Sequence, residues 1–151
     1  MEAFTYPQIE YPESFKQKPF FDLTVRILND VRDHNYDDLA TVCDDDFGII
    51  DINPEGGSEI MRDREGWEKW FTGLFAKLKE MNAHTWSEIT HYEALQGTDM
   101  GYGVVDFDQV FIVGDKRMRF GVIATIIWKK VGNEWKESRY HSSLKGMKEE
   151  A

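Results

Sequence analysis

The chain has 151 residues, 41% hydrophobic and 30% charged, and its 28 acidic against 18 basic residues give a formal net charge of −10. This balance argues against binding to nucleic acid or to an anionic membrane surface, because both require a cationic face. A single cysteine, Cys43, allows neither an internal disulfide nor a multi-cysteine metal site. The sequence shows no long apolar run, no secretory signal pattern and no glycine-rich phosphate loop. We therefore expect a soluble, cytoplasmic protein without a cofactor.

Residues 1–19 contain three of the four prolines, which disfavour helix at their own and at the preceding position. We predict an extended N-terminal arm that lies against the body of the protein, because the segment also carries several aromatic residues. From about residue 20 to 45, apolar residues recur every three or four positions, which predicts a helix. The pair His34-Asn35 interrupts this pattern, and Asn35 can cap a second, short helix.

The middle of the chain predicts a short strand at 47–52, a turn at 53–57 and a longer helix that begins after Asp63. Beyond residue 82 the pattern changes, and strands are predicted at about 83–96, 101–113, 117–130 and 134–144. Helices followed by an antiparallel meander indicate the α+β class, with the N-terminal helices in the concave face of a strongly curved antiparallel sheet. The predicted organisation is an arm at 1–19, one domain at 20–145 and a charged tail at 146–151.

Two predicted hairpins have two-residue turns, Gly114-Asp115 and Gly132-Asn133, and such turns set the register of the strands that they join. Counting back from the second turn pairs Trp128 with Glu137, Ile126 with Arg139 and Ala124 with His141. The face that receives these side chains is otherwise apolar, and it carries Val105, Phe107, Phe111, Phe120, Val122, Ala124, Ile126 and Trp128. The strand at 120–128 is apolar on its other face as well, which favours a homodimer through the back of the sheet.

The last hairpin has a basic strand end, a glycine turn, a tryptophan and a terminal His-x-Ser, here Lys129, Lys130, Gly132, Trp135, His141 and Ser143. In these positions it resembles the final hairpin of SnoaL-like proteins of the nuclear transport factor two-like superfamily. This resemblance implies a cone-shaped α+β barrel that dimerises through its sheet. It also implies either an isomerase, cyclase or dehydratase without a cofactor, or a silent binding domain. Glu137 departs from the family pattern, which has an aliphatic residue there.

Glu137, Arg139 and His141 alternate along the last strand, so the predicted register places all three on the inner face. His141 would act as a general base, Glu137 would orient it, and Arg139 would hold an anionic or carbonyl group of the ligand. The simpler interpretation is a structural ion pair beside a hydrogen-bonded histidine, and we give it the greater weight. Asp51 is a second candidate base if apolar neighbours raise its pKa, although an aspartate before a turn is also an ordinary structural feature.

Four aromatic residues, Trp70, Trp86, Phe107 and Trp128, are predicted to line the apolar part of the pocket, and packing of the core is the alternative role. Asp106 and Asp108 share a strand face, but no third metal ligand accompanies them, so no metal site is predicted. The leading hypothesis is a pocket for a small apolar or carbonyl-bearing molecule. The alternative is a non-catalytic dimerisation or ligand-sensing domain whose cone is filled by side chains.

Overall fold

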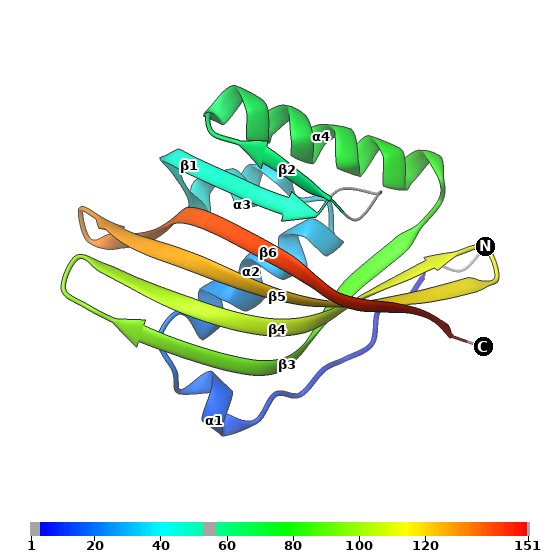
Figure 1. The fold of residues 1–151 in the computed structure, drawn as a ribbon, viewed down its shortest axis with the longest axis horizontal. Helices are drawn as coiled ribbons and strands as arrows, with labels where there is room; N and C mark the ends of the chain where they lie inside the picture. The colour runs from blue at the N-terminus through cyan, green and yellow to red at the C-terminus, as the bar shows by residue number, and fades with distance from the viewer. Residues whose placement is uncertain (1–3, 53–56, 151) are drawn as a thin grey trace.

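A computed structural model describes residues 4–52 and 57–150. It has the expected α+β architecture, in which one six-stranded sheet of order β2-β1-β6-β5-β4-β3 curves around the helices (Figure 1). The helices are α1 (Glu13–Lys16), α2 (Phe21–Arg32), α3 (Tyr36–Val42) and α4 (Arg64–Glu80). The strands are β1 (Cys43–Ile52), β2 (Ser58–Met61), β3 (His84–Gln96), β4 (Met100–Val113), β5 (Lys116–Val131) and β6 (Glu134–Glu150). No described helix is both long and apolar enough to span a bilayer.

The helices begin where the sequence predicts. The Asn35 side chain accepts a hydrogen bond from the Asp38 backbone N–H at 3.2 Å, and Asp63 Oδ1 accepts one from Gly66 N–H at 2.8 Å. Helix α2 turns Phe21 and Ile27 toward the sheet, where they join one core cluster with apolar side chains of α4 and of the strands. The cone is therefore closed over an apolar interior by the side chains of α2, α3 and α4. The predicted turn at 53–57 lies mostly outside the described residues.

Both predicted hairpin turns are confirmed. Gly114 and Gly132 adopt φ angles of 63° and 64°, which glycine reaches without steric cost. The register of β4 against β5 follows from the first turn over its whole length, from Val113 opposite Lys116 to Met100 opposite Lys129. The expected inward face of these two strands is therefore confirmed.

The predicted register of β5 against β6 holds only near the second turn. Trp128 lies opposite Glu137 as expected, but a bulge at Ser138 follows, and Ile127 pairs with Arg139. Ile126 then faces Tyr140 and Ala124 faces Ser142, so the expected pairs of Ile126 with Arg139 and Ala124 with His141 are wrong. The bulge inserts one residue and exchanges the two faces of the strand beyond it.

Both ends of the chain pack on the sheet. The arm at residues 4–19 contains the short helix α1 and follows the edge strand β3, where the Tyr11 hydroxyl accepts a hydrogen bond from Ile89 N–H at 3.3 Å. This cover protects an edge that would otherwise expose unpaired backbone groups. At the other end, β6 continues to Glu150, which pairs with Arg117 of β5, so residues 146–150 are part of the sheet rather than a tail.

Candidate functional site

A cluster of acidic and hydroxyl side chains lies on the inner face where β1 runs parallel to β6. Ile49 is the partner of Tyr140 and Ile50 that of His141, so Asp51 comes beside Ser142. Ser142 Oγ donates a hydrogen bond to Asp51 Oδ1 at 2.7 Å, and Ile52 N–H donates to the same oxygen at 2.8 Å. Both bonds converge on Oδ1 and fix the orientation of the carboxylate.

Glu137 is the most deeply buried acid of this cluster, with 2% of its surface exposed. Its Oε1 accepts a weak hydrogen bond from the Cys43 thiol at 3.7 Å. Burial, opposed by the hydrogen bond from Cys43 and assisted by the negative charge of Asp51, raises the pKa of Glu137 to about 8. Glu137 is therefore mostly protonated at neutral pH and can donate a hydrogen bond.

Asp51 and Tyr140 are also shifted toward their neutral forms. Burial raises the pKa of Asp51, while the hydrogen bonds from Ser142 and Ile52 oppose the change. Burial, followed by the charges of Asp51 and Glu137, raises the pKa of Tyr140 well above its usual value. These mutual effects show that the three groups are electrostatic neighbours, and together they form a site rich in proton donors and acceptors.

Arg139 and His141 do not join this cluster. Both are exposed on the outer face, because the Ser138 bulge turns Tyr140 and Ser142 inward in their place. The Arg139 guanidinium instead binds the backbone carbonyl of Asp46 on β1 and lies 3.5 Å from its carboxylate. The positions expected for Arg139 and His141 are therefore corrected, and neither has the geometry for acid–base work inside the cone. Glu137 and Asp51 do face inward.

Three of the four predicted lining aromatics belong to the interior. Phe107 and Trp128 are core residues, and Trp70 is partly buried and packs against the core cluster. Trp86 lies on the other face of the sheet, which corrects its predicted place in the pocket. Its indole N–H donates to Glu88 at 2.8 Å, and the Arg117 guanidinium lies 5.4 Å from its ring centre. A bulge at Thr90 in β3 separates the two faces, so that Tyr92, but not Trp86, points inward.

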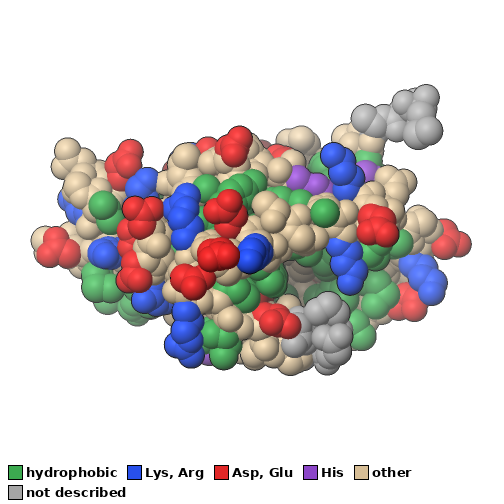
Figure 2. All heavy atoms as spheres, turned by 90° about the horizontal axis from the view of Figure 1, so that it is seen from above, with side chains coloured by type: hydrophobic (Ala, Val, Ile, Leu, Met, Phe, Trp, Pro, Cys, Tyr) green, Lys and Arg blue, Asp and Glu red, His purple; other side chains and the backbone are tan. Residues whose placement is uncertain are grey.

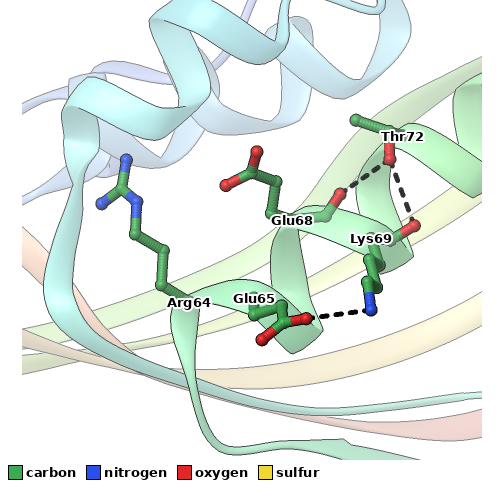
Figure 3. Close-up of a pocket in the computed structure, with 5 residues that line it drawn as sticks. All are labelled: Arg64, Glu65, Glu68, Lys69 and Thr72. Carbon is green, nitrogen blue, oxygen red and sulfur yellow. Dashed lines mark hydrogen bonds and ion pairs between the residues drawn. The ribbon is translucent and has the colours of Figure 1, made fainter.

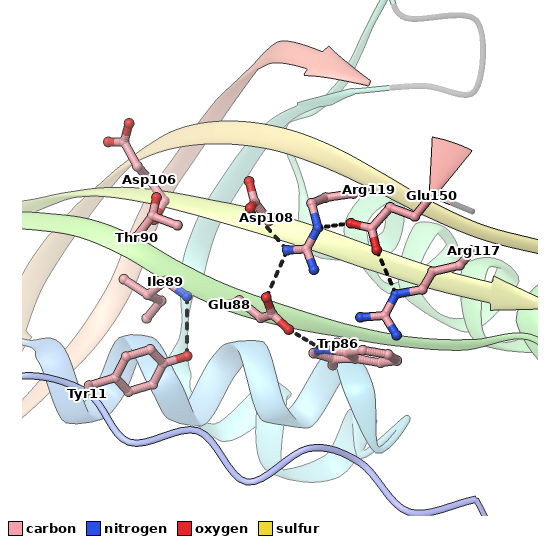
Figure 4. A network of polar contacts seen from close by, with 10 residues as sticks. All are labelled: Tyr11, Trp86, Glu88, Ile89, Thr90, Asp106, Asp108, Arg117, Arg119 and Glu150. Atoms are coloured by element: carbon pink, nitrogen blue, oxygen red, sulfur yellow. Dashed lines mark hydrogen bonds and ion pairs between the residues drawn. The ribbon is translucent and has the colours of Figure 1, made fainter. Parts of the chain in front are cut away.

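The outer face carries an ion-pair network around Arg119 (Figure 4). Its Nη1 donates to Glu88 at 2.8 Å and to Asp108 at 3.1 Å, and its Nε donates to Glu150. Asp106 binds Lys145 at 2.8 Å. Asp106 and Asp108 are thus paired with basic side chains, and no group of three or more metal-ligating residues occurs in the described parts of the chain.

The sequence matches no protein-family model and no curated protein. A hexachlorocyclohexane dehydrochlorinase from Novosphingobium barchaimii superimposes with a TM-score of 0.69 at 16% identity, over 92% of this chain and 90% of that chain. The benzoate 1,2-dioxygenase beta subunit of Burkholderia mallei gives 0.70 at 12% identity, over 82% and 87%. A protein with a cystatin-like fold from Caulobacter vibrioides gives 0.62 at 15% identity, over 82% and 84%. The chain has the cystatin-like, nuclear transport factor two-like fold.

Two hollows lie outside the interior of this cone. One, of about 420 Å³, runs along the exposed side of α4, where Lys69 is paired with Glu65 at 3.0 Å and Thr72 bonds back to its own helix (Figure 3). The other, of about 380 Å³, lies where α2 and α4 end. Neither hollow is lined by Asp51, Glu137 or Tyr140.

Sequence reasoning missed Tyr140, Ser142 and Cys43 as members of the cluster. The predicted register places Tyr140 and Ser142 on the outer face, and the sequence around Cys43 excludes a disulfide and a multi-cysteine metal site but indicates no partner. One signal was present, because a tyrosine and a serine cost less to bury in the cone than an arginine and a histidine. The contact of Cys43 with Glu137 joins residues 94 positions apart and leaves no local pattern.

Proposed function

We propose that the chain binds a small apolar or carbonyl-bearing molecule inside the cone and transfers protons on it without a cofactor. The observation that supports this proposal is the inward-facing cluster of the buried Glu137 with the partly buried Asp51 and Tyr140. Burying acids in an apolar core is costly when no cationic side chain compensates them, and none of the interactions of Asp51 and Glu137 described above involves a cation. Such clusters concentrate at functional sites.

The hydrogen bonds indicate which group accepts a proton and which groups donate hydrogen bonds. Oδ1 of Asp51 is held by Ser142 and Ile52, so Oδ2 is the atom that would take a proton from a carbon beside a carbonyl or a leaving group. Glu137 and Tyr140 keep their protons at neutral pH and would donate hydrogen bonds to the oxygen or leaving group that gains negative charge. The dehydrochlorinase of the same fold is named for an elimination, a reaction that this arrangement suits.

The alternative is a non-catalytic, ligand-sensing or dimerisation domain. It is favoured by the dense aromatic packing of the interior, where Trp67 and Trp128 are fully buried, and by the two hollows that lie elsewhere. Binding without proton exchange separates this alternative from the enzyme.

We expect a screen of neutral carbonyl-bearing and aromatic metabolites to find a ligand that raises the melting temperature by roughly 5–10 °C near a hundredfold excess over Kd. In D₂O the protein should catalyse the exchange of ligand protons for deuterium, which NMR can follow. Asp51→Asn should slow this exchange by at least about a hundredfold, whereas Asp115→Asn at the exposed hairpin tip should not. A ligand that binds without exchange would support the sensing domain, and a screen without a ligand would contradict both the enzyme and the sensing domain and leave the dimerisation domain.

We also propose a two-fold homodimer through the outer face of the sheet. Tyr102 faces Ile127 there and is 40% exposed, and Thr125 lies between Val104 and His141. Wild-type protein should elute with the mass of a dimer in size-exclusion chromatography with light scattering. Thr125→Arg should give a monomer, because a charge in the centre of the interface would be desolvated. Thr72→Arg on α4 is the matched control, and a monomeric wild type would refute the dimer.

A further inference from the structure

The hollow of about 380 Å³ brings together side chains from three elements and the arm. Arg32 and His34 come from the end of α2, Lys79 from the last turn of α4, and His84 from the start of β3. Figure 2 shows histidine and basic side chains next to one another toward the right-hand end of the molecule. A volume of this size is within the range of small-molecule pockets, roughly 300–1,000 Å³.

The charges in the hollow are unusual for a chain with a net charge of −10. Arg32 is held by Asp33 through two hydrogen bonds of 2.8 and 3.0 Å, which leaves Lys79 and the two imidazoles as the remaining cationic groups. Within residues 4–52 and 57–150, Lys79 makes no ion pair. Burial, and then the charge of Lys79, lowers the pKa of His34, so the hollow has a positive field that Asp33 offsets only in part.

The imidazole rings are held in place by stacking. His34 lies on Phe75 with ring centres 4.9 Å apart, and His84 lies on Phe4 at 4.2 Å. In both pairs the rings are nearly parallel, at 11° and 9°. Because the stacking uses the ring faces, the nitrogen atoms at the ring edges stay available for hydrogen bonds.

Two backbone positions beside the hollow end helices. His34 and Asn82 have φ angles of 55° and 51°, in the left-handed region that commonly follows the last residue of a helix. Each follows the end of a helix whose last carbonyls are already bound, with Asn35 N–H donating to Asp30 O at 2.8 Å and Ala83 N–H to Leu78 O at 2.9 Å. The basic side chains are therefore not needed to cap these helices.

We propose that this hollow binds the anionic group of a small molecule, a carboxylate or a phosphate, through Lys79, His34 and His84. The Asn82 side chain and the Tyr6 hydroxyl also line the hollow and can hydrogen-bond to the rest of the molecule. This site is separate from the acidic cluster in the cone, and neither proposal depends on the other.

Binding should tighten as the pH falls below about 6.5, the ordinary pKa of an imidazole, because burial and then the charge of Lys79 hold the pKa of His34 below that value. Four charged or titratable side chains face the two histidines, namely Arg32, Asp33, Lys79 and Tyr6. None of these four has an ordinary pKa near that of an imidazole. A protonated imidazole both attracts an anion and donates from its two ring nitrogens. The anion in turn stabilises the protonated ring, so proton uptake and binding are linked.

The test is a titration of the intact chain with sodium benzoate and, separately, with inorganic phosphate, followed through the imidazole NMR signals at about pH 6 and pH 8. The chain contains its own controls, since His91 and His141 are exposed and lie outside the hollow. We expect saturable shifts for His34 and His84 with a Kd of roughly millimolar. Tighter binding of benzoate would assign a carboxylate ligand, and tighter binding of phosphate a phosphorylated one.

Lys79→Gln should weaken this binding about fivefold, whereas Lys77→Gln in the same exposed turn, but outside the hollow, should not change it. Both variants lose one charge near the end of α4, so they differ only in their place relative to the hollow. Equal shifts of all four histidines, equal effects of the two variants, or no shift with either probe would overturn the proposal. None of these outcomes depends on Asp51, so the proposed function is tested separately.

Discussion

The free energy of unfolding should fall steeply as the pH rises from about 4.5 to about 8, because Glu137 ionises in the unfolded chain but stays protonated in the apolar interior. The pKa of this carboxyl is about 8 in the folded protein and 4.5 at its ordinary value. A raised folded-state pKa means that the stabilising contribution is complete below about pH 4.5 and is lost by about pH 8. The slope is about 1.4 kcal/mol per pH unit, which makes the total on the order of 5 kcal/mol.

Urea denaturation at a series of pH values measures this slope. Glu137→Gln preserves the shape of the side chain and removes its titration, so the free energy of unfolding should vary less with pH than in the wild type. Glu149→Gln, on the exposed part of the same strand, should leave the wild-type slope intact. If Glu137→Gln and the wild type lose stability in parallel, Glu137 is already ionised in the folded protein, and its role as a proton donor fails with it.

The arrangement of elements was accessible from the sequence because local signals determine it. The caps at Asn35 and Asp63 and the glycine turns at 114 and 132 act over three or four residues, and all of them are confirmed. The register of β4 against β5 follows from its turn because no bulge interrupts that ladder. The inward positions of Phe107 and Trp128 follow directly from that register.

Counting from a turn becomes unreliable at the first bulge. In β6 the insertion at Ser138 directs Tyr140 and Ser142 inward, where the uninterrupted ladder would bury Arg139 and His141. The bulge avoids the desolvation of a guanidinium and an imidazole, a cost of several kcal/mol that no local propensity registers. The bulge at Thr90 in β3 has the same effect on the residues around it.

Asp51 illustrates a second limit of prediction from sequence, the pairing of distant segments. Its sequence neighbours indicate a turn, and its proximity to Glu137 and Ser142 exists only because β1 pairs in parallel with β6, about 90 residues later in the chain. Parallel pairing of distant segments leaves no signature in a window of a few residues. The apolar neighbours of Asp51 in the sequence are thus enough to propose it as a candidate base, but they do not identify its partners.

A second pH-dependent loss of stability should come from Asp30, on the buried side of α2. Burial, followed by a hydrogen bond with Asp38 and the negative charge of that residue, raises the pKa of Asp30 from 3.8 to about 7. Arg26 binds Asp38 through two bonds of 2.8 and 2.6 Å and holds the pKa of Asp38 low, so the shared proton stays on Asp30. The stabilising contribution of the protonated Asp30 should be lost between about pH 4 and pH 7, with a total of up to about 4 kcal/mol.

Asp30→Asn keeps a donor toward Asp38 and removes the titration, so the slope between about pH 4 and pH 7 should decrease while the loss that Glu137 causes persists to about pH 8. Asp37→Asn, in the exposed first turn of α3, should leave both intact. The double variant Asp30→Asn with Glu137→Gln should combine the two effects if the sites are independent. An unchanged slope in Asp30→Asn would mean that Asp30 is ionised when folded, and that Arg26 neutralises both carboxylates rather than one.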